Sequence, residues 1–121
     1  MRTMYILVNE SLKMSTGKAC SQVAHAVAEL AANTPNWNFG AINPNKIIVL
    51  SAKDDLQMRH IADYLADLGI DSSLYIDEGD YETIPFSATA MAIMPSEGPF
   101  DETVEKLLEK FDLYPKRHFW K

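Results

Sequence analysis

Short apolar runs alternate with helical repeats of apolar residues along this chain. Residues 5–8 and 46–50 are rich in branched and aromatic side chains, which predicts two strands buried on both faces. Residues 73–76 and 89–94 predict two further strands. All four runs are much shorter than the ~20 apolar residues that cross a bilayer, so we expect no membrane insertion.

Three other segments repeat apolar residues every three or four positions, which predicts amphipathic helices. The first covers about residues 16–32, begins at the capping residues Ser15 and Thr16, and carries one apolar stripe made of Ala19, Val23, Ala26, Val27 and Leu30. The second is capped by Asp54 and Asp55 and ends at Gly69. The third follows Pro99, and its apolar positions are Val104, Leu107, Leu108 and Phe111.

The predicted order of elements is βαβαββα, which is typical of an α/β fold. Strands separated by helices favour parallel neighbours, but the segment between the last two strands carries no helical pattern. We therefore expect one antiparallel or edge pairing, and a mixed four-stranded sheet flanked by helices. A length of 121 residues fits a single domain over residues 1–121.

The composition is that of an ordinary globular protein, with 47% apolar and 23% charged residues. The net charge of −6 hides a segregation of charge. Residues 1–53 carry +3, residues 54–112 carry −12, and the tail 113–121 carries +3. An anionic partner would therefore meet the N-terminal half or the tail. The alternative is that these charges are solvated helix faces without a partner.

The N-terminus lacks the features of a secretory signal, because its apolar run stops at Asn9 and no small-residue cleavage site follows. We expect a cytoplasmic protein. A single cysteine, Cys20, cannot form an internal disulfide, and no Cys/His pairs stand at zinc-binding spacing, so we expect neither metal nor cofactor. The segment ending in Gly17 and Lys18 is no nucleotide-binding P-loop, because Leu12 and Ala19 occupy two of its required positions.

The polar face of the first predicted helix is the sharpest local feature. Lys18, Gln22, His25 and Glu29 fall within about 60° of one another, on the side opposite the apolar stripe. Lys18 stands in the first turn, where the helix dipole disfavours a cation, which indicates that it meets an anion. The alternative interpretation is an ordinary solvated face.

An acidic segment at residues 77–82 follows the third predicted strand. Ligands of open α/β sheets bind beyond the carboxyl ends of strands, so Asp77, the acid nearest the strand end, is the best candidate for a functional carboxylate. The alternative is a solvent-exposed turn, since Asp and Gly are turn residues.

These motifs resemble those of type II peptidyl-tRNA hydrolases. Residues 12–18, Leu-Lys-Met-Ser-Thr-Gly-Lys, with Gln22 and His25 behind them, are similar to that family's Leu-Lys-Met-Gly-Lys-Gly-Lys…Gln…His opening. Asp77-Glu78-Gly79 resembles the family's Asp-Ala-Gly, and the resemblance continues without a gap through four further positions: Pro85, Ser87, Thr89 and Pro95. It extends from Tyr5 to about Tyr114.

The resemblance implies a mixed four-stranded sheet between helices, and hydrolysis of the ester that joins a peptidyl or N-blocked aminoacyl group to the 3′ ribose of tRNA. It implies Lys18, Asp77 and Thr89 as catalytic residues, and the substrate-binding residues that accompany them would be Gln22, His25, Lys13 and Ser87. Because water can attack an ester directly, no covalent nucleophile is needed. Our hypothesis is that Asp77 orients or deprotonates the water, directly or through Thr89, while Lys18 stabilises the oxyanion or holds a phosphate, and His25 orients the substrate.

The chain departs from the family pattern at several positions. Ser15 and Thr16 stand where the family has Gly and Lys, Asp80 and Tyr81 where it has Arg and Thr, and Phe86 where it has Gly. The lost lysine and the acidic stretch from Asp71 to Glu82 favour an alternative function, a non-catalytic module that binds RNA, a nucleotide or a protein on the same scaffold. A homodimer is a further possibility, since paired domains would enlarge the tRNA footprint.

Overall fold

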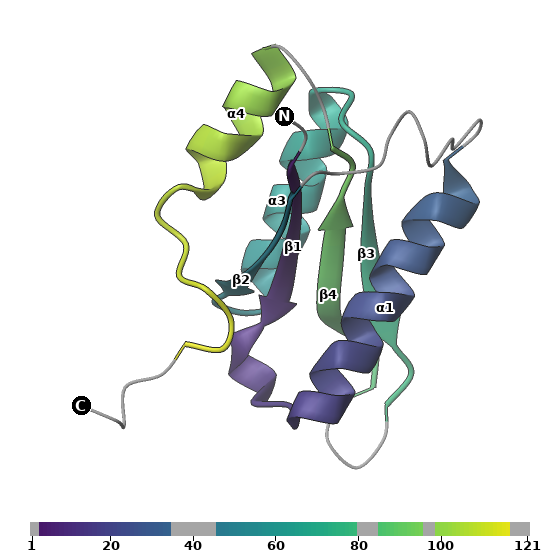
Figure 1. Cartoon of the computed structure of the whole chain (residues 1–121). Coiled ribbons are helices and arrows are strands. Elements are labelled where there is room, and N and C mark those ends of the chain that lie inside the picture. The colour runs from purple at the N-terminus through teal and green to yellow at the C-terminus, as the bar shows by residue number, and fades with distance from the viewer. Residues whose placement is uncertain (1–2, 35–45, 80–84, 96–98, 117–121) are drawn as a thin grey trace.

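The computed structural model describes residues 3–34, 46–79, 85–95 and 99–116 (Figure 1). The elements follow in the order β1 (Thr3–Asn9), the 3-10 helix η1 (Glu10–Leu12), α1 (Thr16–Asn33), β2 (Lys46–Ala52), α3 (Asp55–Asp67), β3 (Ser72–Asp77), β4 (Ser87–Ile93) and α4 (Pro99–Leu108). The predicted βαβαββα order is confirmed, and η1 is an addition that periodicity did not predict. Within the described residues, no helix is both long enough and apolar enough to cross a membrane.

The sheet has four strands in the order β2-β1-β4-β3, with β1 and β2 parallel. The predicted mixed sheet is confirmed. The antiparallel strand, however, is β4 in the centre of the sheet, so it makes two antiparallel pairings, with β1 and with β3, where one was expected. The reason is that β3 lies two places from β1 and leaves a slot, which β4 fills from the opposite direction.

Strand burial follows the position of each strand in this order. The prediction of two buried faces holds for β1, whose Leu7 and Val8 are fully buried. It is wrong for β2, which is an edge strand and leaves Ile47 56% exposed. The cause is that α1 packs on the β4 and β3 half of its face and leaves the far edge of the sheet less covered (Figure 1).

Hydrophobic clusters lie on both faces of the sheet. On one face, α3 and α4 pack on the sheet through a cluster that includes Leu7, Met58, Leu65, Met91 and Leu108. On the other face, Ala26 and Leu30 of α1 pack against Ala90 and Ala92 of β4. Alanines on both elements present little side-chain volume, so α1 lies close to the sheet.

The helix ends confirm the predicted caps. The Ser15 side chain accepts from the backbone N of Lys18 at 3.3 Å, and Asp54 Oδ1 accepts from the N of Gln57 at 2.9 Å. Gly69 has φ +78 just beyond α3, a conformation that glycine adopts without strain. The last helix ends earlier than predicted, at Leu108. Phe111 lies beyond it in a turn and still packs against the core.

Leu65 and Leu56 provide a test of the core. They lie on the same helix, but Leu65 is fully buried and Leu56 is 61% exposed. We expect Leu65→Ala to lower the free energy of unfolding by about 2–5 kcal/mol, because it opens a cavity between α3 and the sheet. Leu56→Ala should change it by about 0.5 kcal/mol or less. Urea denaturation measures both, and equal losses would contradict the assigned core.

Candidate active site

Except for the exposed His25, the polar side of α1 faces the sheet. Gln22 is 2% exposed, and Lys18 and Glu29 are half-buried. The predicted solvated alternative is therefore wrong for these residues, and so is the placement of this face opposite the apolar stripe. At 100° per residue the centres of the two stripes lie only about 110° apart, so one broad side of the helix carries both. The sheet covers both stripes together.

The first polar residue of this side, Lys18, meets Asp77. The Lys18 Nζ lies 3.5 Å from Asp77 Oδ1, and the two side chains keep 14% and 13% of their surface exposed. Asp77 is the last residue of β3, as the strand-end argument predicted. Its other oxygen, Oδ2, accepts from the backbone N of Gly79 at 3.0 Å. The carboxylate is therefore held from two sides, at the point where the strand ends.

A second polar contact lies in the buried layer beside this pair. The Thr89 hydroxyl donates to Gln22 Oε1 at 2.6 Å, and both residues are fully buried or nearly so. Thr89 is the extra residue of a β-bulge, because Ala88 pairs with Ile76 and Ala90 with Tyr75. Bulges re-aim side chains and are frequent beside active sites. Here the residue in the bulge, Thr89, is the one whose hydroxyl donates to Gln22 of α1.

Further along α1 the same pattern continues on β3. The His25 ring stacks on the Tyr75 ring, with centroids 4.6 Å apart and planes 4° from parallel. Glu29 Oε1 accepts from the Ser73 hydroxyl at 2.7 Å. His25 itself is exposed, and one face of its ring is covered by Tyr75.

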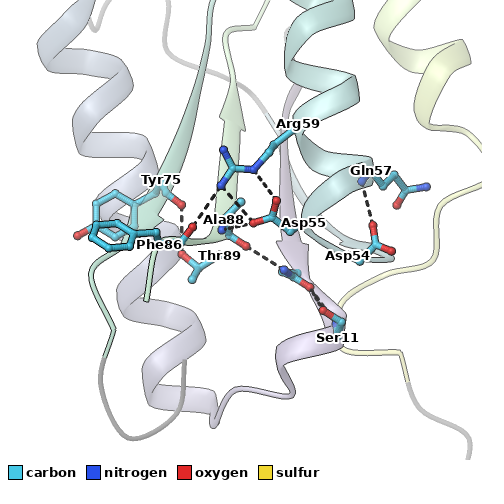
Figure 2. A network of polar contacts seen from close by, with 10 residues as sticks. Ser11, Asp54, Asp55, Gln57, Arg59, Tyr75, Phe86, Ala88 and Thr89 are labelled. Carbon is cyan, nitrogen blue, oxygen red and sulfur yellow. Dashed lines mark hydrogen bonds and ion pairs between the residues drawn. The ribbon is translucent and has the colours of Figure 1, made fainter. Parts of the chain in front are cut away.

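A polar frame from α3 supports the beginning of β4 from the other face of the sheet (Figure 2). Asp55 Oδ2 accepts from the backbone N of Ala88 at 2.7 Å, and Asp55 also pairs with Arg59. Arg59 Nη2 in turn donates to the backbone O of Phe86 at 3.2 Å. The hydrogen bond from Arg59 lowers the pKa of Asp55 below its ordinary value. The ionised Asp55 therefore contributes its full stabilisation of the fold at neutral pH, and this contribution is lost only as the pH falls through the lowered pKa.

The remaining predicted residues fall in different places. Ser87 is paired with Asp77 in the sheet register and so lies beside it. Lys13 is exposed, and it lines two hollows of about 400 and 810 Å³ near η1. The described linings of these hollows do not include Lys18 or Asp77. The substitutions at Asp80 and Tyr81 lie outside the described residues.

Sequence reasoning missed four residues that hold the site together: Asn9, Asp55, Arg59 and Tyr75. Asn9 is buried at the end of β1, where its Nδ2 donates to the backbone O of Ala88 at 2.9 Å and its Oδ1 accepts from the backbone N of Ser11 at 3.0 Å. A polar residue directly after an apolar run, followed by Ser two positions later, was an available signal for Asn9. Asp55 and Arg59 are four positions apart and pair locally, but their contacts with β4, like that of Tyr75 with α1, join residues distant in the sequence.

Comparisons with known proteins agree on one family. A family model described as peptidyl-tRNA hydrolase PTH2 matches residues 2–114. A peptidyl-tRNA hydrolase of Pyrobaculum aerophilum is 30% identical over 118 residues, which cover 92% of this chain and 96% of that protein. One from Thermococcus sibiricus is 34% identical over 107 residues, covering 84% and 88%. One from Haloquadratum walsbyi is 29% identical over 114 residues, covering 90% and 96%.

The buried Thr89–Gln22 contact can be tested by a double-mutant cycle. Thr89→Val should cost about 1–3 kcal/mol of unfolding free energy, because it leaves a buried amide oxygen without its donor. Adding Gln22→Met removes that oxygen, so the double variant should lose less than the sum of the two single variants. Chemical denaturation of all four proteins gives the coupling. Strict additivity would contradict the contact.

Proposed function

Since the chain belongs to the PTH2 family of peptidyl-tRNA hydrolases, we infer that it hydrolyses the ester between a peptidyl or N-blocked aminoacyl group and the 3′ ribose of tRNA. One observation supports the assignment of that chemistry to a particular place in the chain. The Lys18 ammonium lies 3.5 Å from the Asp77 carboxylate, at the end of β3, and both side chains remain partly exposed. A cation and a base side by side are the groups that ester hydrolysis by water needs.

We propose the following roles for this pair. Asp77 holds a water molecule and accepts its proton as the water oxygen attacks the ester carbonyl. Lys18 stabilises the negative charge that develops on the carbonyl oxygen. Collapse of the tetrahedral intermediate breaks the bond to the ribose oxygen, which takes the proton from Asp77 and so restores its carboxylate, while the new peptide carboxylic acid loses its proton to solvent. The products are a peptide with a free carboxylate and a tRNA with a free 3′ hydroxyl.

The buried layer has a positioning role in this proposal. The Thr89 hydroxyl carries one proton and directs it to Gln22 Oε1 at 2.6 Å. That bond supports the arrangement in which Asp77 holds the water directly, not through Thr89. Gln22 is one turn along α1 from Lys18, so fixing Gln22 against the sheet also fixes where the Lys18 side chain starts. Ser87, beside Asp77, and the exposed ring of His25 would contact the substrate.

Lys13 would contact the substrate farther from the ester. It is exposed beside η1 and lines hollows that Lys116 also lines. Cations there could meet phosphates of the tRNA. A non-catalytic binding module is the less favoured function, because the relatives reported above are named as hydrolases and the chain matches them over nearly their whole length.

We also propose where the protein works and how it assembles. An enzyme acting on peptidyl-tRNA would work where translation takes place, which supports the cytoplasm. A homodimer would present two sites and a larger surface to tRNA, and sedimentation of the protein with and without tRNA would measure it.

Lys18→Ala and Asp77→Asn test the catalytic pair. Each should lower kcat/KM for N-acetyl-aminoacyl-tRNA by about 100-fold or more, because oxyanion stabilisation or proton acceptance is lost. The matched controls are Lys46→Ala on β2 and Asp63→Asn on α3, both exposed, and they should retain wild-type rates. Thermal unfolding checks that the variants are folded. Wild-type rates in both folded site variants would remove the assignment.

A salt titration tests the contact with tRNA phosphates. With the slow Asp77→Asn variant, the logarithm of tRNA affinity should fall linearly with the logarithm of salt concentration, by roughly 0.7–0.9 per phosphate contacted. Lys13→Ala should make this slope shallower by about one contact. If the affinity of the Asp77→Asn variant for tRNA does not change with salt concentration, the protein does not hold the phosphates.

A further inference from the structure

Phe86 is held in an unusual conformation next to the proposed catalytic carboxylate. Its φ is +64, in the left-handed region that glycine enters freely and a bulky residue enters at a cost. Its side chain is also 70% exposed, so no core packing offsets that cost. At this position an exposed phenylalanine lowers both the stability of the fold and the solubility of the protein relative to glycine.

Hydrogen bonds on both sides of the residue fix this backbone. The N of Phe86 donates to the backbone O of Asp77 at 2.6 Å, and its carbonyl accepts from Arg59 Nη2 at 3.2 Å. The next peptide is fixed as well, because Ala88 donates to Asp55. Figure 2 shows the contacts of Arg59 with Phe86 and of Asp55 with Ala88 at the start of β4. Phe86 is therefore tied to the residue whose carboxylate would hold the attacking water.

The substrate places a flat group close to the reacting bond. The ester lies on the terminal ribose of the tRNA, and the base of that nucleotide is attached to the same ribose. An exposed aromatic ring offers a face on which a base can stack, and such stacking contributes substantially to the binding of single-stranded nucleic acid. Peptidyl side chains vary from substrate to substrate, but the terminal base does not. A ring on a fixed backbone suits the partner of constant shape, which is the base.

We propose that Phe86 is a substrate-binding residue that stacks on the terminal base of the tRNA and thereby positions the ester at Lys18 and Asp77. This inference rests on the proposed function. It gives a role in substrate specificity to Phe86, which stands where the family pattern has glycine.

The experiment compares two substrates that differ only in the base. One is N-acetylalanyl-tRNA with its terminal adenosine, and the other is the same RNA ending in an abasic ribose that carries the same ester. The wild-type protein should prefer the complete substrate by about tenfold in kcat/KM, mainly through KM. Phe86→Ala should abolish this preference, and Phe86→Trp should keep it.

Phe86→Gly separates the ring from the fold. Glycine accepts the positive φ, so this variant should be at least as stable as the wild type in thermal unfolding while losing the preference for the base. Leu113→Ala is the matched control, because Leu113 is 68% exposed and lies at the β2 edge. It should leave the preference unchanged.

Two results would overturn the inference. One is an unchanged preference for the base in folded Phe86→Ala and Phe86→Gly. The other is a loss of kcat/KM in the Phe86 variants that depends on the acyl group and not on the terminal base. N-acetylphenylalanyl and N-acetylalanyl substrates, each with and without the base, would show it. An active wild type with either result rejects the role of Phe86 alone, whereas a wild type that cleaves no ester rejects the proposed function together with it.

Discussion

The structure depends on the packing of one broad side of α1 against β3 and β4. That side carries an apolar stripe and a polar stripe next to each other, so the sheet must supply partners for both. Alanines of β4 meet the apolar stripe. The polar stripe meets Asp77, Thr89, Tyr75 and Ser73. The core of this face and the candidate site are therefore built by the same helix–sheet contact.

The match between the helix and the strand is periodic. Alternate residues of β3 point to one face, so Ser73, Tyr75 and Asp77 all face α1, while Leu74 and Ile76 pack on the opposite side. Along α1, the polar residues recur every three or four positions. They meet β3 in reverse order: Lys18 with Asp77, His25 with Tyr75, and Glu29 with Ser73. Each contact therefore fixes the register of the next, and the ion pair stands at the last step, where the strand ends.

Much of this architecture could be predicted from local sequence. Strand runs, helical repeats and the caps at Ser15 and Asp54 depend on neighbouring residues, and the structure places them as expected. The central position of β4 could not be predicted, because it depends on which strands leave a slot for it. The covering of the polar stripe was also missed, since periodicity describes the faces of a helix but not what lies against them. In the site, Asp77 followed from its place at a strand end, whereas Asp55 and Arg59 act on a segment about thirty positions away.

The cation in the first turn of α1 shows how a local sequence signal can point to a contact with a residue distant in the sequence. A lysine there is unfavourable against the helix dipole, which indicated an anion nearby. The structure supplies that anion from within the chain, since Asp77 lies at the N-terminal end of α1. The carboxylate therefore offsets both the ammonium charge and the positive end of the helix. In the proposed mechanism, a substrate carbonyl that approaches Lys18 would meet a cation already oriented by Asp77, and an ammonium with three donors can keep that pairing while it binds an oxyanion.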